Sequence, residues 1–187
     1  MILCVGTTGS GKTLLLRALA ENANPGSVNK HTTAVSTTGA NITNITRINP
    51  KKPELADSVR VREIGGTMSP LWGNFVEAGR TQVIYVVDVS APEKIGPATI
   101  DLIELLNQPA LQGAPFLIVF SKTDIKSSRT LNELKQLMRL DEIKEHSTQE
   151  LHSLDFNTEE TSKIEPILNW CLKFKNINYE MMNGTTY

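Results

Sequence analysis

The sequence predicts an α/β fold in which helices cover an open, mostly parallel β-sheet. The segments "QVIYVVDVS" (82–90) and "PFLIVFSK" (115–122) are nearly continuous apolar runs, which is typical of strands covered on both faces of a parallel sheet. Segments whose apolar residues recur at helical spacing separate the expected strands. Strands that alternate with helices form open sheets whose ligands bind at the carboxyl ends of the strands.

The N-terminal part begins with an expected strand over residues 2–5, which leads directly into "GTTGSGKT" (6–13). A helix is expected next, because apolar side chains cluster in "LLLRALA". Residues 22–44 are polar and rich in Asn, Ser and Thr, which predicts a long loop. Two strands, at 42–49 and 58–66, are then expected around the hairpin "PKKPELAD".

The C-terminal part continues the alternation of strands and helices. Apolar residues at helical spacing predict a helix over 93–107, a second over 130–140 and a final helix that contains Ile164, Ile167, Leu168, Cys171 and Leu172. A weaker strand is expected at 150–156. Trp170 on the final helix is predicted to be a core residue, whereas Trp72 could equally pack internally or contact a partner.

Size and composition fit one soluble domain. The chain has 187 residues with 40% apolar and 21% charged residues, enough for a sizeable core. Its net charge is −1, which argues against broad binding to nucleic acid because such binding needs a basic face. The two cysteines, Cys4 and Cys171, lie in apolar segments far apart in sequence and are expected to be reduced, buried thiols.

The sequence carries no sign of membrane attachment. The longest apolar runs are far shorter than the roughly 20 residues of a membrane span, and without a basic region or an extended apolar stretch near residue 1 no signal peptide is expected. Position 2 is Ile2 rather than Gly, and the terminal "MMNGTTY" has no cysteine for prenylation. We therefore expect a cytoplasmic monomer without a direct lipid anchor.

The segment "GTTGSGKT" matches the phosphate-binding pattern G-x-x-x-x-G-K-[ST] in full. Glycines allow backbone amides to point inward around phosphate groups, and the following helix adds the positive end of its dipole. Lys12 would reach the β- and γ-phosphates, and the Thr13 hydroxyl would bind magnesium. The whole loop is the candidate site: Gly6, Thr7, Thr8, Gly9, Ser10, Gly11, Lys12 and Thr13. A chance glycine-rich turn is the alternative, but a strand before and a helix after it argue against chance.

The segment "VFSKTD" (119–124) indicates which base is bound. It ends an expected buried strand, so its last residues lie at the ligand edge of the sheet. The Asp124 carboxylate can accept hydrogen bonds from N1–H and the exocyclic amine of guanine, a donor pair that adenine lacks. The aliphatic stem of Lys122 could lie over the base. A lone K-x-D is a weak signal, and a solvated strand end is the alternative.

Together these motifs resemble the Ras-like small GTPases, specifically the ADP-ribosylation factor and factor-like branch. The resemblance covers about residues 1–175 as one GTP-binding domain, which leaves 176–187 as a short tail. It rests on "GTTGSGKT", "STTGAN", "EIGG" followed by "PLW", "VVDVS" and "SKTD". It implies a six-stranded, mostly parallel sheet, GTP or GDP bound with Mg²⁺, and two loops that change shape with the γ-phosphate.

The resemblance also implies roles for residues of the two switch segments. Thr37 matches the threonine that binds magnesium in the GTP state, although one more threonine in a threonine-rich loop remains the alternative. Gly66 matches the glycine whose amide contacts the γ-phosphate. Glu63 stands where the family has an aspartate that holds magnesium through water, and Thr67 stands where a glutamine orients the attacking water.

Several positions depart from the family pattern. Ser36 replaces the proline before the switch threonine. Ser121 replaces an asparagine, which removes an amide that braces the base-binding loop. The last base-binding motif should fall near "NTE" (157–159) but is hardly recognisable.

The leading hypothesis is a regulatory switch in which GTP-dependent binding of partners is the output and hydrolysis resets it. Effectors, exchange factors and activating proteins would contact the segments 30–45 and 63–80. The substitution at Thr67 predicts slow intrinsic hydrolysis, with Lys12 and Gly66 as the other catalytic groups. A pseudo-GTPase that binds GTP without cycling is the second hypothesis. A P-loop kinase is a third, but it leaves "SKTD" and "EIGG" without a purpose.

The three histidines, His31, His146 and His152, have no partners at metal-ligand spacing.

Overall fold

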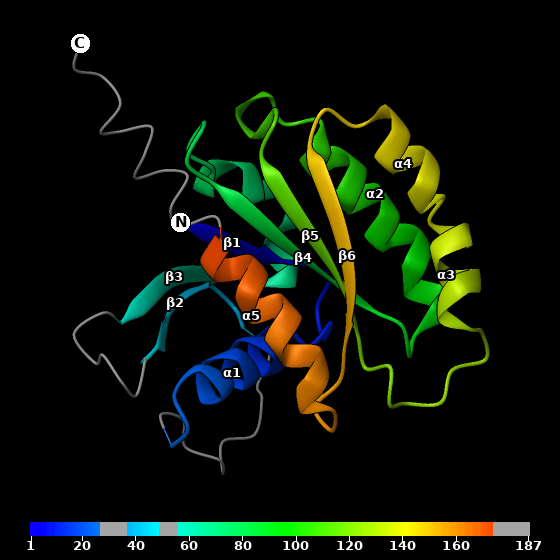
Figure 1. The fold of residues 1–187 in the computed structure, drawn as a ribbon. Helices are drawn as coiled ribbons and strands as arrows, with labels where there is room; N and C mark the ends of the chain where they lie inside the picture. The colour runs from blue at the N-terminus through cyan, green and yellow to red at the C-terminus, as the bar shows by residue number, and fades with distance from the viewer. Residues whose placement is uncertain (27–36, 49–55, 174–187) are drawn as a thin grey trace.

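The fold is a six-stranded sheet between two layers of helices, as seen in a computed structural model that describes residues 1–26, 37–48 and 56–173 (Figure 1). The strands are β1 (Ile2–Val5), β2 (Ala40–Arg47), β3 (Asp57–Ile64), β4 (Gln82–Asp88), β5 (Pro115–Ser121) and β6 (Glu150–Phe156). The main helices are α1 (Lys12–Ala23), α2 (Ile95–Leu106), α3 (Leu131–Leu137), α4 (Leu140–His146) and α5 (Ile164–Lys173). A ten-residue 3₁₀ segment, η2 (Gly66–Phe75), follows β3.

The sheet order is β2-β3-β1-β4-β5-β6, and among the strands of the described ranges only the β2–β3 pair is antiparallel. The predicted six-stranded, mostly parallel α/β sheet is therefore confirmed. Central strands β1, β4 and most of β5 are fully buried, which explains their continuous apolar sequences. Because the parallel strands end at one edge, the loops after β1, β3, β4 and β5 meet there.

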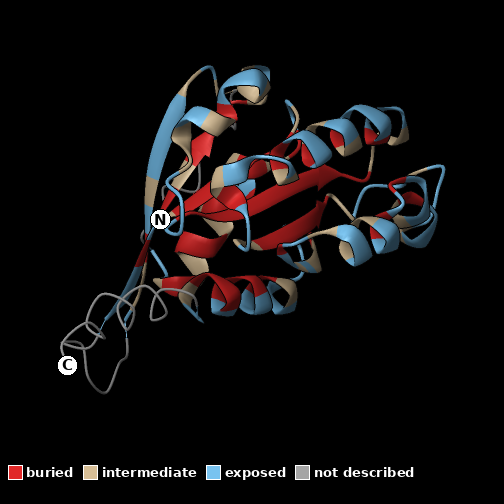
Figure 2. Ribbon diagram, turned by 90° about the horizontal axis from the view of Figure 1, so that it is seen from above, coloured by how far each residue is buried: buried red, intermediate tan, exposed pale blue. Residues whose placement is uncertain are grey.

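Each face of the sheet has its own hydrophobic core (Figure 2). Helices α1 and α5 cover one face, where Leu16, Leu168 and Trp170 are buried. Helices α2 and α3 and the segment η2 contribute to the core on the other face, which includes Trp72 and Tyr85. The prediction that Trp170 is a core residue is confirmed. Cys4 and Cys171 are both free and buried, as expected.

The single helix predicted over 130–140 is two helices. Helix α3 begins at a capping box, in which the Thr130 hydroxyl accepts a hydrogen bond from the Glu133 amide and the Glu133 carboxylate accepts one from the Thr130 amide. It ends at Leu137, and Arg139 then adopts a left-handed conformation with φ of 51°. That turn redirects the chain into α4, whose first two positions carry Leu140 and Asp141. The prediction failed because the apolar spacing continues across the turn.

Several sequence-based expectations fall on residues outside the described ranges. They concern His31 and Ser36 in the first switch segment, the tip of the hairpin at 49–55, and the tail at 176–187. Among the residues that are described, no helix combines the length and the apolar composition that crossing a bilayer requires.

Candidate nucleotide-binding site

The phosphate-binding loop joins β1 to α1 and has the backbone geometry that its glycines allow. Gly6, Gly9 and Gly11 have φ values of 144°, 78° and 91°, in a region that other residues avoid. At Gly6 a Cβ atom would lie 2.2 Å from the Val86 carbonyl oxygen of β4. The loop can therefore pass this close to the neighbouring strand only with glycine at that position.

Lys12 opens helix α1 and turns back over this loop. Its Nζ donates hydrogen bonds of 2.9 Å to the carbonyl oxygens of Gly6 and Thr7, and the residue is only 5% exposed. Burial lowers the pKa of Lys12, while the nearby Glu63 carboxylate counteracts part of that shift. The ammonium group is thus held over the concave side of a glycine-rich loop, where it can meet phosphate oxygens.

Three oxygens that the sequence associates with magnesium lie together beside the loop. Glu63 Oε1 accepts hydrogen bonds from Thr13 Oγ1 at 2.5 Å and from Thr37 Oγ1 at 3.1 Å. The two hydroxyl oxygens are 3.4 Å apart. Hard oxygen donors of this kind suit Mg²⁺. In the described ranges, His, Cys, Asp and Glu side chains form no cluster of three or more that could hold a metal ion.

The Gly65–Gly66 pair brings the second switch segment against the phosphate-binding loop. A Cβ atom at Gly66 would lie 2.2 Å from the Thr8 amide nitrogen, and one at Gly65 would lie 2.2 Å from the Thr37 carbonyl oxygen. The start of η2 therefore approaches both the loop and the first switch segment at backbone distance. Thr67, the next residue, is exposed.

Trp72, further along η2, holds the glycine pair in position from within the core. Its indole Nε1 donates a 3.3 Å hydrogen bond to the Gly65 carbonyl oxygen. The ring is 2% exposed and packs edge-on against Tyr85, with centroids 6.1 Å apart. Of the two roles left open for Trp72 by the sequence, the structure shows internal packing. Trp72 anchors η2 to the sheet and so holds the glycine pair in place.

A cleft of about 270 Å³ collects most of these groups. It is lined by Thr8, Gly9, Gly11, Lys12, Thr13, Leu14, Thr37, Glu63, Gly66 and Lys122. Ser10 and Gly6 are buried beneath it, and Thr67 does not line it. Asp124 is exposed and does not line this cleft; it lines a separate hollow of about 330 Å³ together with Val89, Leu134 and other residues.

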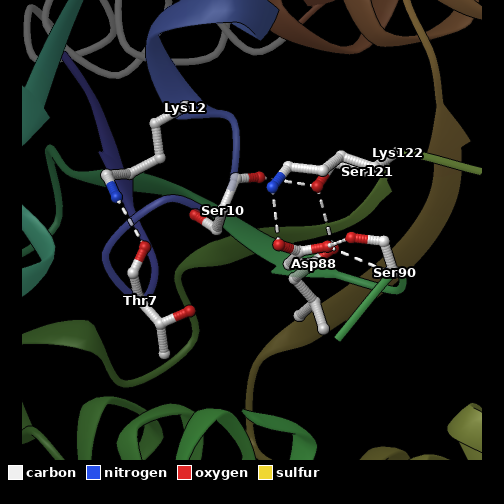
Figure 3. A network of polar contacts seen from close by, with 8 residues as sticks. Thr7, Ser10, Lys12, Asp88, Ser90, Ser121 and Lys122 are labelled. Carbon is white, nitrogen blue, oxygen red and sulfur yellow. Dashed lines mark hydrogen bonds and ion pairs between the residues drawn. The ribbon is translucent and has the colours of Figure 1, made fainter. Parts of the chain in front are cut away.

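Ser121, the last residue of β5, contacts the phosphate-binding loop through Ser10 (Figure 3). Its Oγ is 2.6 Å from the Ser10 carbonyl oxygen and 3.0 Å from that of Val87. Ser121 thus connects the end of β5 to the phosphate-binding loop, a contact distinct from the brace of the base-binding loop that the asparagine amide would supply. One hydroxyl proton can serve only one of the two carbonyls at a time.

Lys122 is tied to β4 by a carboxylate that the sequence analysis did not single out. Its Nζ lies 2.6 Å from Asp88 Oδ2, and Asp88 Oδ1 accepts hydrogen bonds from the Ser90 amide and hydroxyl (Figure 3). Burial acts to raise the pKa of Asp88, but Lys122 and Ser90 together bring it below its ordinary value. Lys122 itself has a positive φ of 62°. The only sequence signal for Asp88 was its place at the end of the buried "VVDVS" strand.

Asn157 organises the loop after β6, where the sequence placed the last base-binding motif. Its Oδ1 accepts hydrogen bonds from the amides of Glu159 and Glu160, at 3.0 and 2.7 Å. Its Nδ2 lies 3.1 Å from Thr123 Oγ1 in the "SKTD" loop. The loop after β6 is therefore attached to the loop after β5, which a sequence pattern of "NTE" alone did not reveal.

Fold and site together define a class of protein: a P-loop nucleotide-binding protein of the small GTPase type. Motifs after β1, β3 and β5 of one parallel sheet meet at its carboxyl edge, and two glycine-containing segments approach each other there.

Comparison with known proteins gives the family. Residues 1–173 match the ADP-ribosylation factor family, and the chain belongs to it. It is 30% identical over 173 residues to human ADP-ribosylation factor-like protein 16, covering 91% of this chain and 83% of that protein. It is 27% identical over 150 residues to ADP-ribosylation factor-like protein 3 of Chlamydomonas reinhardtii, covering 79% and 76% of the two chains.

The fold is also that of solved small GTPase structures. The chain matches the Arl6 (BBS3) small GTPase of Trypanosoma brucei, solved with a bound GppNp analogue, with a TM-score of 0.68 over 92% of this chain and 94% of that one at 20% identity. Members of the family are GTPases that bind guanine nucleotide with Mg²⁺ and act with regulators and effectors. The predicted resemblance is thus confirmed, and the chain is a GTP-binding switch protein of this family.

Proposed function

We propose that this chain binds GTP with Mg²⁺ in the cleft between the phosphate-binding loop and Gly66, and that it hydrolyses GTP slowly. The observation that carries the proposal is the convergence of Thr13, Thr37 and Glu63 on one point beside Lys12. These groups come from segments far apart in sequence, and their oxygens are of the kind that binds Mg²⁺. Magnesium bound there would neutralise phosphate charge.

The chain's own groups would act by positioning and electrostatics. The amides of the phosphate-binding loop and the Lys12 ammonium would hold the β- and γ-phosphates. The Gly66 amide would report the γ-phosphate, because Gly66 brings the start of η2 to the loop at backbone distance. Lys122 and Asp124 would hold the guanine base, with Lys122 fixed by Asp88.

Slow hydrolysis follows from the residue at position 67. Even with a glutamine in place, intrinsic turnover in Ras is on the order of 10⁻⁴ per second. The Thr67 hydroxyl is shorter than that amide, and in the structure the residue is exposed and does not line the cleft. The same observation favours the second candidate, a pseudo-GTPase that binds GTP without appreciable hydrolysis. An activating protein could supply the missing group.

Partners would read the segments 30–45 and 63–80. Ile42 on β2 and Leu71 on η2 are 50% and 46% exposed. Each lies close in sequence to a group that would touch magnesium or phosphate, so a change of nucleotide could alter the surface that they form.

Two measurements test the proposal. Titration with fluorescent guanine and adenine nucleotides should show a clear preference for guanine, and Asp124→Asn should shift the preference toward xanthine nucleotides. Equal binding of guanine and adenine nucleotides would refute the proposal.

A single-turnover assay with and without cell extract then separates the two candidates. Slow phosphate release that the extract accelerates supports the switch, and no release in either condition supports the pseudo-GTPase.

A further inference from the structure

Glu63 differs from the aspartate that the family pattern implies, and its side chain lines the cleft beside the phosphate-binding loop. It ends in the cleft with its oxygen bonded to hydroxyls from α1 and from the first switch segment. The residue is only 1% exposed. Among the described residues, Lys, Arg and His form ion pairs with other acidic groups but none with Glu63.

A buried carboxylate in this situation calls for a cation. Burying an ionised group is costly unless a charge or a metal ion compensates it. The Lys12 ammonium interacts electrostatically with Glu63 but donates its hydrogen bonds to the carbonyl oxygens of Gly6 and Thr7. The two threonine hydroxyls donate hydrogen bonds to Glu63 Oε1, but being neutral they do not balance the charge of the carboxylate.

The three oxygens match the size of a magnesium shell. Glu63 Oε1, Thr13 Oγ1 and Thr37 Oγ1 form a triangle with edges of 2.5, 3.1 and 3.4 Å. Octahedral Mg²⁺ with bonds of about 2.0–2.1 Å places neighbouring ligand oxygens about 2.9 Å apart. Each edge lies within about half an ångström of that value, so small shifts would let all three oxygens bind one ion directly.

An aspartate at position 63 would not reach this place. Its carboxylate would lie roughly 1.5 Å further back, the length of one carbon–carbon bond. A metal–oxygen bond cannot stretch by that much, whereas a bridging water molecule fills such a gap. The extra methylene of Glu63 therefore changes what kind of ligand the residue can be.

We propose that Glu63 binds the magnesium ion directly, alongside Thr13 and Thr37, in place of a contact made through water. This inference rests on the proposed function, since the ion would arrive with a guanine nucleotide. Three protein oxygens and two phosphate oxygens fill five of the six positions of octahedral Mg²⁺ and leave one water. A glutamate that acts through water leaves two.

The number of metal-bound water molecules is the test. The full chain is loaded with the GTP analogue GppNp and Mn²⁺, and the bound waters are counted by electron paramagnetic resonance in ¹⁷O-enriched water. We expect one bound water in the wild-type protein and one more in Glu63→Asp. Glu77→Asp changes an exposed glutamate that does not line the cleft, and this variant should have the same number of metal-bound waters as the wild-type protein.

The outcomes separate this inference from the proposed function. Guanine nucleotide titration of the wild-type chain comes first, and failure to bind would refute both. Binding with two waters in the wild-type protein would overturn direct ligation by Glu63 while the proposed function stands. The wild-type count decides the question even if Glu63→Asp does not fold, and equal counts in a folded Glu63→Asp variant would also contradict the inference.

Discussion

At the scale of single residues, the base side of the site depends on a buried charge. Asp88 is 5% exposed and holds the Lys122 ammonium, which itself remains partly exposed. Ser90 supplies two further hydrogen bonds to the same carboxylate. Because a charge-assisted bond inside the protein fixes the ammonium, it also fixes where the aliphatic stem of Lys122 can lie.

Replacing Asp88 by Asn should destabilise the protein and loosen nucleotide binding. The neutral amide keeps the shape but leaves the Lys122 ammonium without its counter-charge, a loss of about 1–3 kcal/mol in unfolding free energy. Nucleotide dissociation should become several-fold faster because the stem is less well fixed. Urea unfolding and the release of a fluorescent nucleotide measure the two effects.

The pH dependence of this variant follows from the lowered pKa of Asp88. A carboxyl group with a depressed pKa in the folded state stabilises the protein above its unfolded pKa of about 3.9, and this contribution is lost as the pH falls through the folded value. The stability difference between wild type and Asp88→Asn should be constant from pH 8 to 5 and shrink only below about pH 4. Asp155→Asn, which removes one of the two carboxylate partners of Lys163 at the surface, should cost at most about 1 kcal/mol.

Local motifs made part of the site predictable from sequence. The phosphate-binding loop and "SKTD" could be located from short local patterns, because the glycine spacing of the one and the position of the other at a strand end determine the local backbone conformation. Asp88 was not singled out and Asn157 was located only through "NTE", because the contacts of both depend on neighbours that the fold supplies, Lys122 for one and Thr123 for the other. Ser121 could be recognised as a departure, but its contact with the Ser10 carbonyl could not.

At the scale of elements, buried strands were the most predictable part. The strands at 2–5, 82–88 and 115–121 coincide with apolar runs because both of their faces are covered. The segment η2 had no such signal. It is held by the Trp72 indole and by backbone contact at the glycine pair. Neither contact produces the periodic spacing of apolar residues by which a helix or a strand is recognised in a sequence.

Gly66→Ala tests whether η2 works through this backbone contact. A methyl group would meet the Thr8 amide nitrogen at 2.2 Å and the Thr7 carbonyl carbon at 2.5 Å, so η2 must move away from the loop. We expect GTP affinity to fall by about tenfold or more, an effect of ~1.4 kcal/mol, with GDP affinity much less affected. Equilibrium titration with both nucleotides measures the ratio.

A second glycine provides the control for this substitution. Gly96 lies in α2, and a Cβ atom there meets nothing within 4 Å. Gly96→Ala should leave both affinities unchanged and change stability by no more than about 0.5 kcal/mol, since Gly96 is only the second residue of α2 and precedes Pro97. An equal loss of GTP and GDP binding in Gly66→Ala would show that the contact supports the phosphate-binding loop rather than sensing the γ-phosphate.

At the scale of the whole molecule, the site occupies one edge of a sheet that two separate cores hold rigid. The core under α1 and α5 supports the helix that carries Lys12 and Thr13, and the core under α2 supports η2. Arg47 of β2 bonds to Glu165 and Asn169 of α5, at 2.8 and 3.0 Å. The strand between the two switch segments is thereby attached to the last helix of the domain.

Leu168→Ala tests whether the core beneath α5 contributes to binding only through global stability. Leu168 is fully buried, so removing its side chain should lower the unfolding free energy by about 2–5 kcal/mol. Leu168 does not line the cleft, and so guanine nucleotide at 100 times its Kd should add ~2.7 kcal/mol to both variant and wild type. Urea unfolding with and without nucleotide, at concentrations set by each protein's own Kd, gives these increments.

The dissociation constant itself is the decisive quantity in this comparison. An unchanged Kd in Leu168→Ala means that the cleft keeps its shape while the domain loses stability, as expected if the sheet alone positions the site. Leu137→Ala, which removes a side chain that is 51% exposed on α3, should change stability by no more than about 0.5 kcal/mol. A Kd weakened tenfold by Leu168→Ala alone would instead mean that packing of α5 against α1 sets the position of Lys12 and Thr13, and that the core beneath them is part of the nucleotide site.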